Sequence, residues 1–450
     1  MHDALTASIA TTTVVNDIDS KAYETVQFLT RLGVAMTVAG ASVTEVQNSL
    51  TQSAGAYGLR SNITVGPTMI LVQVQGQHSV SLDMSSAMQR SLRLDQVAGI
   101  WRLVERAMAG TIQPAQGLTQ LSVIWGSTSR FAESIRLLGY MLMAVGFGLS
   151  LHPSTGVVIA CILFGLVVGE ILLLTEGHAT IRVLLPVMTA LGVGLLVFLA
   201  VDYGLASGPL LLLIPPLVTF LPGAMLTTGM MELTSGDIVS GSSRLVAGMV
   251  QLVLLLFGLL IAASIVGLPT AEAFSTVGPS NFWSWGPWAG TFIYGIGIYL
   301  HRTAPARSLP WLLLVLLVAQ AGQAAGSAIA GGYLGGFFGA LAMTPVAYAI
   351  QRWPSAPPAM VSILPAYWLL VPGALGLMKL TELVSETSQA AINDIGKTIY
   401  TLIAIALGVT VGQSVYVPLA SWSTRVAGRI ARGRTRPDPS GDASLPGAGQ

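Results

Sequence analysis

The sequence predicts a polytopic α-helical membrane protein, with about ten transmembrane helices in two inverted five-helix repeats behind a small soluble α+β domain. The membrane class follows from composition: 53% of the 450 residues are hydrophobic and only 9% are charged, whereas soluble globular proteins carry about 25% charged residues. From residue 135 onward, apolar runs of about 20 residues, long enough to span a hydrocarbon core of ~30 Å, follow one another nearly to the C-terminus. We therefore expect a multi-pass protein of the plasma or inner membrane.

The part of the chain before the apolar runs has the composition of a soluble domain. Residues 1–20 are small and polar, so we expect a disordered N-terminus, and no apolar stretch follows a basic start as in a cleavable signal peptide. Residues 21–132 mix helical periodicity with β-branched segments, which indicates an α+β domain. The expected helices cover roughly 25–34, 43–57, 94–108 and a short stretch near 117–121, and the expected strands cover 63–65, 69–74 and 79–82, with a turn at 76–78.

The apolar runs divide into two sets of five. The first repeat, residues 133–268, has runs at roughly 135–151, 155–175, 181–201, 208–230 and 243–267. The second repeat, residues 283–418, has runs at roughly 284–301, 308–327, 331–350, 358–379 and 396–417. The arginine-rich tail, residues 422–450, ends in a Pro/Gly/Ser stretch and should be disordered.

A proline-glycine pair inside an apolar run is what indicates the duplication. Pro222-Gly223 recurs 150 residues later as Pro372-Gly373, and the same offset matches Glu232 with Glu382. Because each set has five spans, an odd number, the second set must enter the membrane from the opposite side, which makes the repeat inverted. Proline removes a helical hydrogen bond that lipid cannot replace. Paired Gly/Pro-interrupted segments in two inverted halves point to the binding site of a secondary transporter.

The basic residues predict the orientation, because Lys and Arg concentrate in cytoplasmic loops. With the N-terminus inside, four of the five outer loops contain no Lys or Arg, and the fifth contains Lys379 and Lys397. Both termini are then cytoplasmic, as is the soluble domain. The basic residues on the inner side are Arg182, Arg244, Arg302, Arg307, Arg352 and the arginines of the tail.

Polar residues gather around and after the first break, and we take them as candidates for substrate binding and transport. The candidate set is Pro222, Gly223, Thr227, Thr228, Ser240, Gly241 and Arg244, with Pro372 and Gly373 in the second repeat. The alternative is that the segment from Glu232 to Arg244 is a cytoplasmic loop with solvated charges.

Three carboxylates are candidates for proton coupling, in the order Asp237, Glu170 and Glu232. Glu170 lies near the end of the second run, and a charge at the bilayer centre costs about 2.5 to 3.5 kcal/mol on insertion scales. We therefore expect its side chain to face the helix bundle or a cavity. The alternative is a position near enough to the interface to stay wet.

Several other functions are not indicated. A net charge of +1 argues against nucleic-acid binding. We expect no metal and no cofactor, because Cys161 is the one cysteine and the five histidines lack ligand spacing. His78 and Asp83, near three serines, match no hydrolase motif. Without a P-loop, the chain has no visible means of using ATP, so an ion gradient is the expected energy source.

The segment after the first break resembles the P-G … G-D-x-x-S-G-x-x-R-L signature of the threonine/serine exporter family. The matching residues are Pro222-Gly223, Glu232-Leu233, Gly236-Asp237, Val239-Ser240-Gly241 and Arg244-Leu245. In the soluble domain, Ala39-Gly40-Ala41-Ser42 with Glu45-Val46, Gly58-Leu59 and Pro67-Thr68 is similar to the family's opening segment. The resemblance covers about residues 22–415, and implies a cytosolic N-terminal domain, ten spans, and export of L-threonine and L-serine with the proton gradient.

The sequence departs from that family pattern in two places. Gly66 stands where the family more often shows threonine before Pro67-Thr68, and the second repeat has no counterpart of the S-G-x-x-R-L segment. The leading hypothesis is a proton-coupled secondary exporter of small hydrophilic amino acids, not an enzyme, working by alternating access. Its expected partners are the amino acid, protons and the bilayer, and assembly as a homo-oligomer is left open. The alternatives are a membrane-embedded hydrolase and a channel or scaffold subunit.

Overall fold

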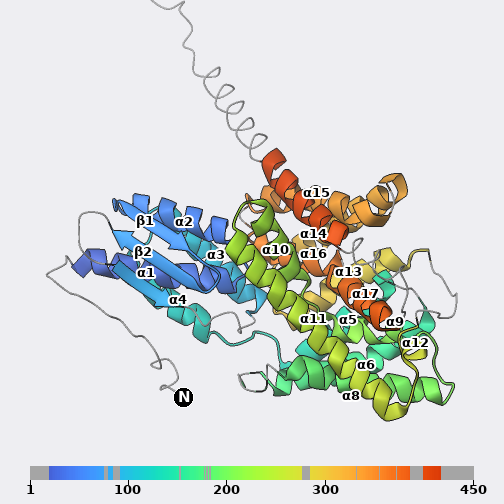
Figure 1. Cartoon of the computed structure of the whole chain (residues 1–450). Helices are drawn as coiled ribbons and strands as arrows, with labels where there is room; N and C mark the ends of the chain where they lie inside the picture. The colour runs from blue at the N-terminus through green and yellow to red at the C-terminus, as the bar shows by residue number, and fades with distance from the viewer. Residues whose placement is uncertain are drawn as a thin grey trace, which may run out of the picture.

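The computed structural model pairs a small α+β domain with a larger body of helices (Figure 1). The residues it describes are 20–74, 80–84, 92–151, 154–176, 178, 181, 184–275, 284–330, 332–353, 355–370, 372–385 and 399–416. The predicted disordered N-terminus, the basic tail, the turn at 76–78 with His78, and Lys397 lie outside these residues.

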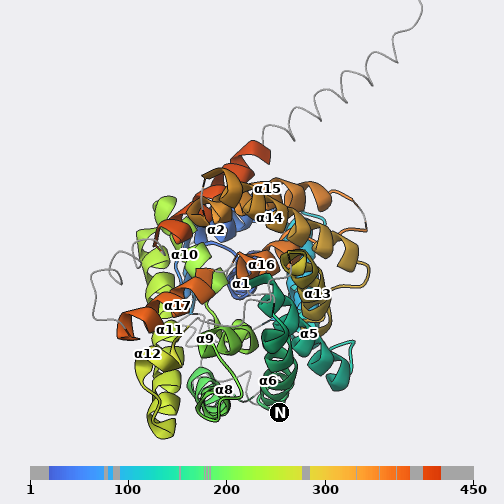
Figure 2. The same ribbon diagram turned by 90° about the vertical axis from the view of Figure 1, so that its right-hand side faces the viewer.

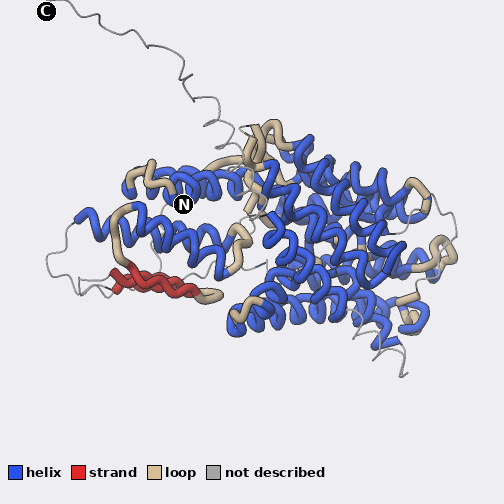
Figure 3. The backbone as a smooth tube through the Cα atoms, turned by 90° about the horizontal axis from the view of Figure 1, so that it is seen from above, coloured by secondary structure: helices blue, strands red, loops and turns tan. Residues whose placement is uncertain are grey.

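The N-terminal domain contains four helices and a three-stranded antiparallel sheet of order β1-β2-β3. Figure 3 shows the strands along one side of this domain, with helices beside them. The predicted helices and strands are confirmed, although the short last helix is longer than expected. The elements are α1 (Ser20–Val38), α2 (Val43–Ala56), β1 (Ser61–Val65), β2 (Met69–Val74), β3 (Val80–Met84), α3 (Leu94–Met108) and α4 (Pro114–Gly126).

A tight turn between α1 and α2 presents the start of α2 to the helical body. Gly40 has a φ of +91°, a left-handed conformation that glycine adopts without steric cost. Ser42 then acts as the N-cap of α2, its hydroxyl accepting the N–H of Glu45 at 3.3 Å. Serine is among the preferred N-cap residues because it satisfies an N–H that has no partner within the helix.

Seven stretches among the described residues are long and apolar enough to cross a membrane. Large apolar side chains such as Leu163, Met188 and Phe257 are exposed on them, as expected where lipid replaces water. The stretches are α5 (Glu133–Leu151), α6 (Thr155–Leu174), α8 (Leu185–Asp202), α11 (Ile238–Val266), α14 (Leu309–Ala330), Met360–Thr381 and Ile399–Tyr416.

The remaining predicted spans are helical but short or broken. The helix α13 (Gly286–His301) has 16 residues, and the apolar part of α15 (Gly332–Ile350) is the shorter segment Leu334–Ile350. A further short helix, α12 (Thr270–Ala273), follows α11. The structure thus supports a multi-pass membrane protein, and the number of ten spans stays a prediction.

The fourth predicted span is interrupted where its prolines predicted a break. It consists of α9 (Pro209–Leu213), the 3-10 helix η3 (Pro215–Phe220) and α10 (Gly223–Thr234), with Leu221 extended between the last two. The ninth predicted span comprises α16 (Met360–Leu369) and α17 (Pro372–Ser385), which lie on either side of residue 371, outside the described residues. The break at Pro222-Gly223 is thus observed, and a matching break at Pro372-Gly373 stays a prediction.

The helices α5 and α13 lie side by side and touch backbone to backbone (Figure 2). A Cβ atom on Gly139 would lie 2.5 Å from the backbone N of His301, and one on Gly290 would lie 2.6 Å from the carbonyl O of Gly146. Only glycine allows so close an approach of two helices. Gly139 thus faces the end of α13 and Gly146 faces its start, so the two helices run antiparallel.

Each of these two helices also supplies a tyrosine to a proline-containing segment, α5 to η3 and α13 to α16. The Tyr140 hydroxyl donates to the carbonyl O of Pro216 at 2.7 Å, and the Tyr294 hydroxyl donates to the carbonyl O of Pro365 at 3.1 Å. Both tyrosines are fully buried. The helices α5 and α13 therefore each anchor the backbone of a proline-containing segment through a buried tyrosine hydroxyl.

Candidate functional site

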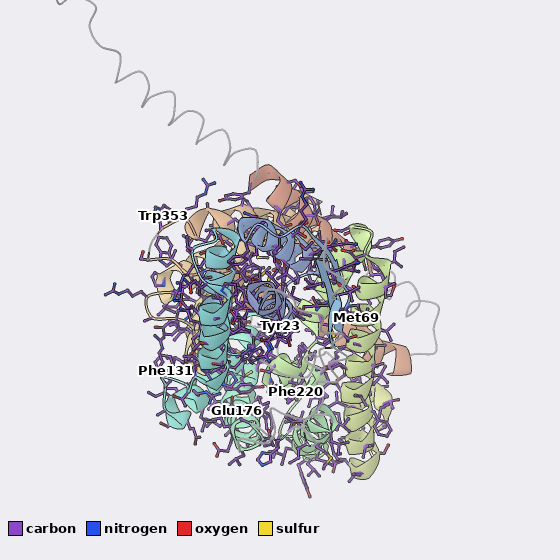
Figure 4. All side chains as sticks on the ribbon, turned by 90° about the vertical axis from the view of Figure 1, so that its left-hand side faces the viewer. Tyr23, Met69, Phe131, Glu176, Phe220 and Trp353 are labelled. Carbon is purple, nitrogen blue, oxygen red and sulfur yellow. The ribbon has the colours of Figure 1, made fainter. Side chains whose placement is uncertain are left out.

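The first interrupted segment borders a cavity of about 720 Å³, which we call the break cavity. The extended Leu221 and the following Pro222 line it, together with Thr219 and Phe220 from the end of η3. Figure 4, seen from the N-terminal domain, labels Phe220 and Glu176 of this lining. Its other charged or titratable lining residues are Arg93, Arg136, Arg244, His301 and Arg302. The cavity therefore combines an interrupted backbone with several cationic side chains.

A second cavity of about 400 Å³, the polar cavity, lies between the N-terminal domain and the second half of the chain. The N-terminal domain contributes Glu45 from α2, and α10 contributes Glu232. Tyrosine, Asn and Gln side chains share the remaining polar wall with Ser and Thr residues; they are Asn48, Tyr348, Tyr367, Gln413 and Tyr416.

Glu232 and Arg244 form an ion pair at the contact between the N-terminal domain and the helical body. Arg244 Nε donates to Glu232 Oε2 at 3.0 Å, and the side chain of Glu232 is fully buried. The other carboxylate oxygen, Oε1, accepts the backbone N–H of Val43 at 3.0 Å, and Arg244 Nη2 donates to the carbonyl O of Ala41 at 3.2 Å. Both members of the pair are thus bonded to the turn that starts α2.

Asp237, five residues after Glu232, also contacts the start of α2. It precedes α11, and its Oδ2 accepts the hydroxyl of Thr44 at 2.5 Å. The backbone N–H of Asp237 donates to the carbonyl O of Glu232 at 2.9 Å. The acidic residues of the signature segment therefore hold the first turn of α2, where backbone N–H groups and the positive end of the helix dipole favour negative charge.

The ion pair lies between the two cavities. Arg244 lines the break cavity, while Glu232 lines the polar cavity. Thr228 and Gly40 line both. Because the bonded pair has one member on each side, it forms part of the wall that separates the two spaces.

A second ion pair in the break cavity was not foreseen from the sequence. The buried Arg136 donates from Nη1 and Nη2 to the two carboxylate oxygens of Glu176 at 2.8 and 2.7 Å. Hydrogen bonding by Arg136 lowers the pKa of Glu176 below its usual value. The ring Nδ1 of His301 lies 3.2 Å from the carbonyl O of Arg136. An ionisable residue just inside the first apolar run was the available signal for Arg136.

The predicted site residues do not all lie in one place: some line a cavity, and others are buried or lie near the ends of helices. Pro222, Thr228 and Arg244 line the break cavity, and Thr228 and Glu232 line the polar cavity. Thr227 is fully buried, and its hydroxyl has no hydrogen-bond partner among the described residues. Gly223 begins α10, and Pro372 and Gly373 are the first described residues of α17.

Two predicted residues of α11 line neither cavity. Ser240 and Gly241 are buried, and a Cβ atom on Gly241 would lie 2.6 Å from the carbonyl O of Gly229. This glycine therefore allows α11 to approach α10 closely. The segment from Glu232 to Arg244 is not a solvated loop: it is mostly helical, and Glu232 is only 1% exposed.

Glu170 does not lie where the cost of an intramembrane charge led us to expect it. Its side chain is exposed on α6 and lines neither cavity. It lies one turn from the end of α6, at Leu174, where an exposed carboxylate can reach the membrane surface. The described residues contain no group of His, Cys, Asp and Glu that could hold a metal ion.

Several apolar helices that can cross a membrane, with one predicted span interrupted beside the break cavity, indicate a multi-pass membrane protein with a candidate binding site. The chain belongs to the ThrE family, described as "Putative threonine/serine exporter", whose profile matches residues 27–266, more than half of the chain. This match confirms the family resemblance and runs from within α1 to the end of α11, while the predicted likeness beyond residue 266 stays a prediction. It is a family of transporters, so the hydrolase alternative is wrong.

No curated protein matches the chain. No solved structure matches it.

Proposed function

We propose that this protein exports L-threonine and L-serine by alternating access, driven by the proton gradient. The observation that carries the proposal is the interrupted segment at Leu221-Pro222-Gly223, which opens onto a cavity of about 720 Å³. A small-molecule site typically has a volume of ~300–1,000 Å³ and a few convergent polar groups. Membership of the exporter family supports the substrate class.

The packing of α5 against α13 supports the inverted repeat within this proposal. Gly290 and Gly297 of α13 each come 151 residues after Gly139 and Gly146 of α5, within one residue of the offset of the Pro-Gly pairs. In the repeat, Gly139 corresponds to Gly290 and Gly146 corresponds to Gly297. The contact between Gly139 and Gly297 therefore corresponds to the contact between Gly290 and Gly146, and both contacts are present. A two-fold axis between the helices would produce this pattern. Inverted halves related in this way suit a carrier with two access states.

The position of the arginines supports cytoplasmic termini. Arg136, Arg244 and Arg302 all line the break cavity together with Thr37 and Arg93 of the N-terminal domain. Arg352 stacks over the ring of Tyr416, which lines the polar cavity beside α2. Because cytoplasmic segments are enriched in Lys and Arg, we assign the side of the N-terminal domain to the cytoplasm. We also propose the domain boundaries predicted from the sequence, with an N-terminal domain at residues 21–132 and repeats at residues 133–268 and 283–418.

For proton coupling, the geometry favours Glu232 and Asp237 over Glu170. Both are bonded to the first turn of α2, so a change in their charge would alter the contact between the N-terminal domain and the carrier. A carboxylate can couple transport to protons when its environment alternates between wet and dry. Glu170, exposed on the outer face of α6, has no such contact with either cavity.

Transport in proteoliposomes tests the function. Purified protein should accumulate labelled threonine and serine against their gradients when a pH gradient is imposed, and should lose this uphill transport when the gradient is collapsed. Gly223→Leu should abolish transport, because a bulky side chain would fill a buried position at the break. Gly192→Leu, at a helical position with open space around it, is the control. Uphill transport without any dependence on pH would contradict proton coupling.

A further inference from the structure

We propose that the polar cavity is a binding site for the amino-acid zwitterion, in which Glu45 of the N-terminal domain receives the ammonium group. This inference rests on the proposed function, because it assigns part of the substrate path to the polar cavity. It makes the N-terminal domain a contributor to substrate binding. The volume of about 400 Å³ lies within the range typical of small-molecule sites.

Glu45 is the acid in the polar cavity that lacks a cation. Glu232 is already paired with Arg244 and capped by the N–H of Val43, whereas no ion pair of Glu45 is present in the part of the chain that the structure describes. Burial raises the pKa of Glu45 to about 7, against a smaller lowering by a backbone hydrogen bond from Ser42. A partly buried carboxylate without a countercharge is stabilised by an incoming cation.

The groups opposite Glu45 suit the other end of a zwitterion. Tyr348 of α15 accepts a hydrogen bond from Gln413 Nε2 at 3.0 Å, so its own O–H remains to donate into the cavity. The Tyr367 hydroxyl of α16 contacts the sulfur of Met231 at 3.6 Å, and a thioether is a weak acceptor that a carboxylate would displace. The two phenols can therefore donate to a carboxylate while Glu45 accepts from an ammonium group.

The titratable groups facing Glu45 come from every side of the cavity. They are Glu232 of α10, Tyr348 of α15, Tyr367 of α16 and Tyr416 of the last described helix. The charged groups next to these are Arg244, on Glu232, and Arg352, over the ring of Tyr416. Because Arg244 is engaged by Glu232 and Arg352 by Tyr416, neither is paired with the carboxylate of Glu45.

Threonine counterflow at equal pH on both sides of the membrane tests the assignment. Glu45→Gln should raise the KM for threonine about 10- to 100-fold, the range for one hydrogen bond to a charged group. Inhibition by 2,3-dihydroxybutanoate, in which a hydroxyl replaces the ammonium group, should be unchanged in Glu45→Gln. The matched control is Glu24→Gln, which removes the same charge from an exposed position of α1 and should leave KM unchanged. An unchanged KM in Glu45→Gln, or an equal loss of threonine and of the analogue, would overturn the proposal.

A labelling experiment on the wild-type protein gives an answer that does not depend on the variant or on transport. Dicyclohexylcarbodiimide should modify Glu45, detected by mass spectrometry, and threonine but not 2,3-dihydroxybutanoate should protect it. Protection in a protein that fails to transport threonine would support the binding site and contradict the export function. Transport without protection would contradict the binding site and leave the export function standing.

Discussion

Arg244 Nε donates to Glu232 Oε2 at 3.0 Å, and the carboxylate that it meets is fully buried. The two residues belong to one signature segment, yet Glu232 also bonds to the backbone of the first residue of α2 and Arg244 to the turn just before it. The pair therefore joins α10, α11 and the N-terminal domain at one point.

Removing one member of this pair should destabilise the protein. Arg244→Leu leaves the Glu232 carboxylate buried without its partner, a loss of about 3–5 kcal/mol for a buried pair. Thermal unfolding of the purified protein should show a clear fall in the transition temperature. The double variant Glu232→Gln/Arg244→Leu should recover part of the loss, because it leaves no uncompensated charge. An Arg244→Leu protein as stable as the wild type would contradict the assigned pairing.

Asp237→Asn should separate uphill transport from exchange. We expect loss of pH-driven accumulation with threonine/threonine counterflow retained, because exchange needs no net movement of protons. Glu170→Gln, at an exposed position on α6, should leave both activities near normal. Both activities are measured in the same proteoliposomes. Loss of counterflow in Asp237→Asn would instead assign this residue to substrate binding or to folding.

Gly146→Ala should disrupt the contact between α5 and α13. The added methyl group would collide with the backbone of Tyr294 and with the carbonyl O of Gly290, the latter at 2.6 Å. Since neither helix backbone can move without the other, we expect a loss at the upper end of the 1–3 kcal/mol range for overpacking. Gly156→Ala, where the new methyl group meets nothing within 4 Å, is the control. The thermal stability of both variants is measured in detergent. Equal stability of Gly146→Ala and Gly156→Ala would contradict the close contact between α5 and α13.

Glu45 should contribute a loss of stability as pH rises from about 4.5 to 7. Burial raises the pKa of this carboxyl to about 7 from an unfolded value of 4.5, so the folded state binds more protons than the unfolded state within that window. Stability then decreases with pH, by at most roughly 3 kcal/mol at 1.36 kcal/mol per pKa unit. Glu45→Gln should flatten the dependence of the transition temperature on pH, whereas Glu24→Gln should not. The other acid facing Glu45, Glu232, is paired with Arg244 and is unchanged in both variants.

Cysteine labelling in intact cells checks the orientation. In a Cys161→Ala background, an impermeant maleimide should react with Ser207→Cys, in the exposed loop between α8 and α9, and not with Ser122→Cys, which is exposed on α4. Ser122→Cys should react once the membrane is permeabilised. Reaction of Ser122→Cys in intact cells would place the N-terminal domain outside.

The elements that local sequence determines were predicted well. The helix at 94–108 agrees with α3 to the residue, and the Pro222-Gly223 pair marked the interruption before α10. Proline and glycine act on the backbone of their own segment, so their effect can be read without knowing the partner.

What depends on contacts between distant residues could not be predicted. Nothing in the sequence pairs Arg136 with Glu176, 40 residues away, or Val43 with Glu232, 189 residues away. The close packing of Gly241 could not be predicted for the same reason, because its neighbour Gly229 lies on another helix. Glu45 was visible as part of a family motif, but its charge became significant only when Tyr348 and Tyr367 were found across the cavity.

The turn around Gly40 touches both halves of the helical body. A Cβ atom on Gly40 would lie 2.9 Å from the Leu364 side chain of α16, while the next residue, Ala41, accepts a hydrogen bond from Arg244 of α11. If the two halves rotate apart, one of these contacts must break or the turn must travel with one half. The N-terminal domain thus links α11 to α16 through one turn, so any movement of one of these helices relative to the other must break a contact of that turn.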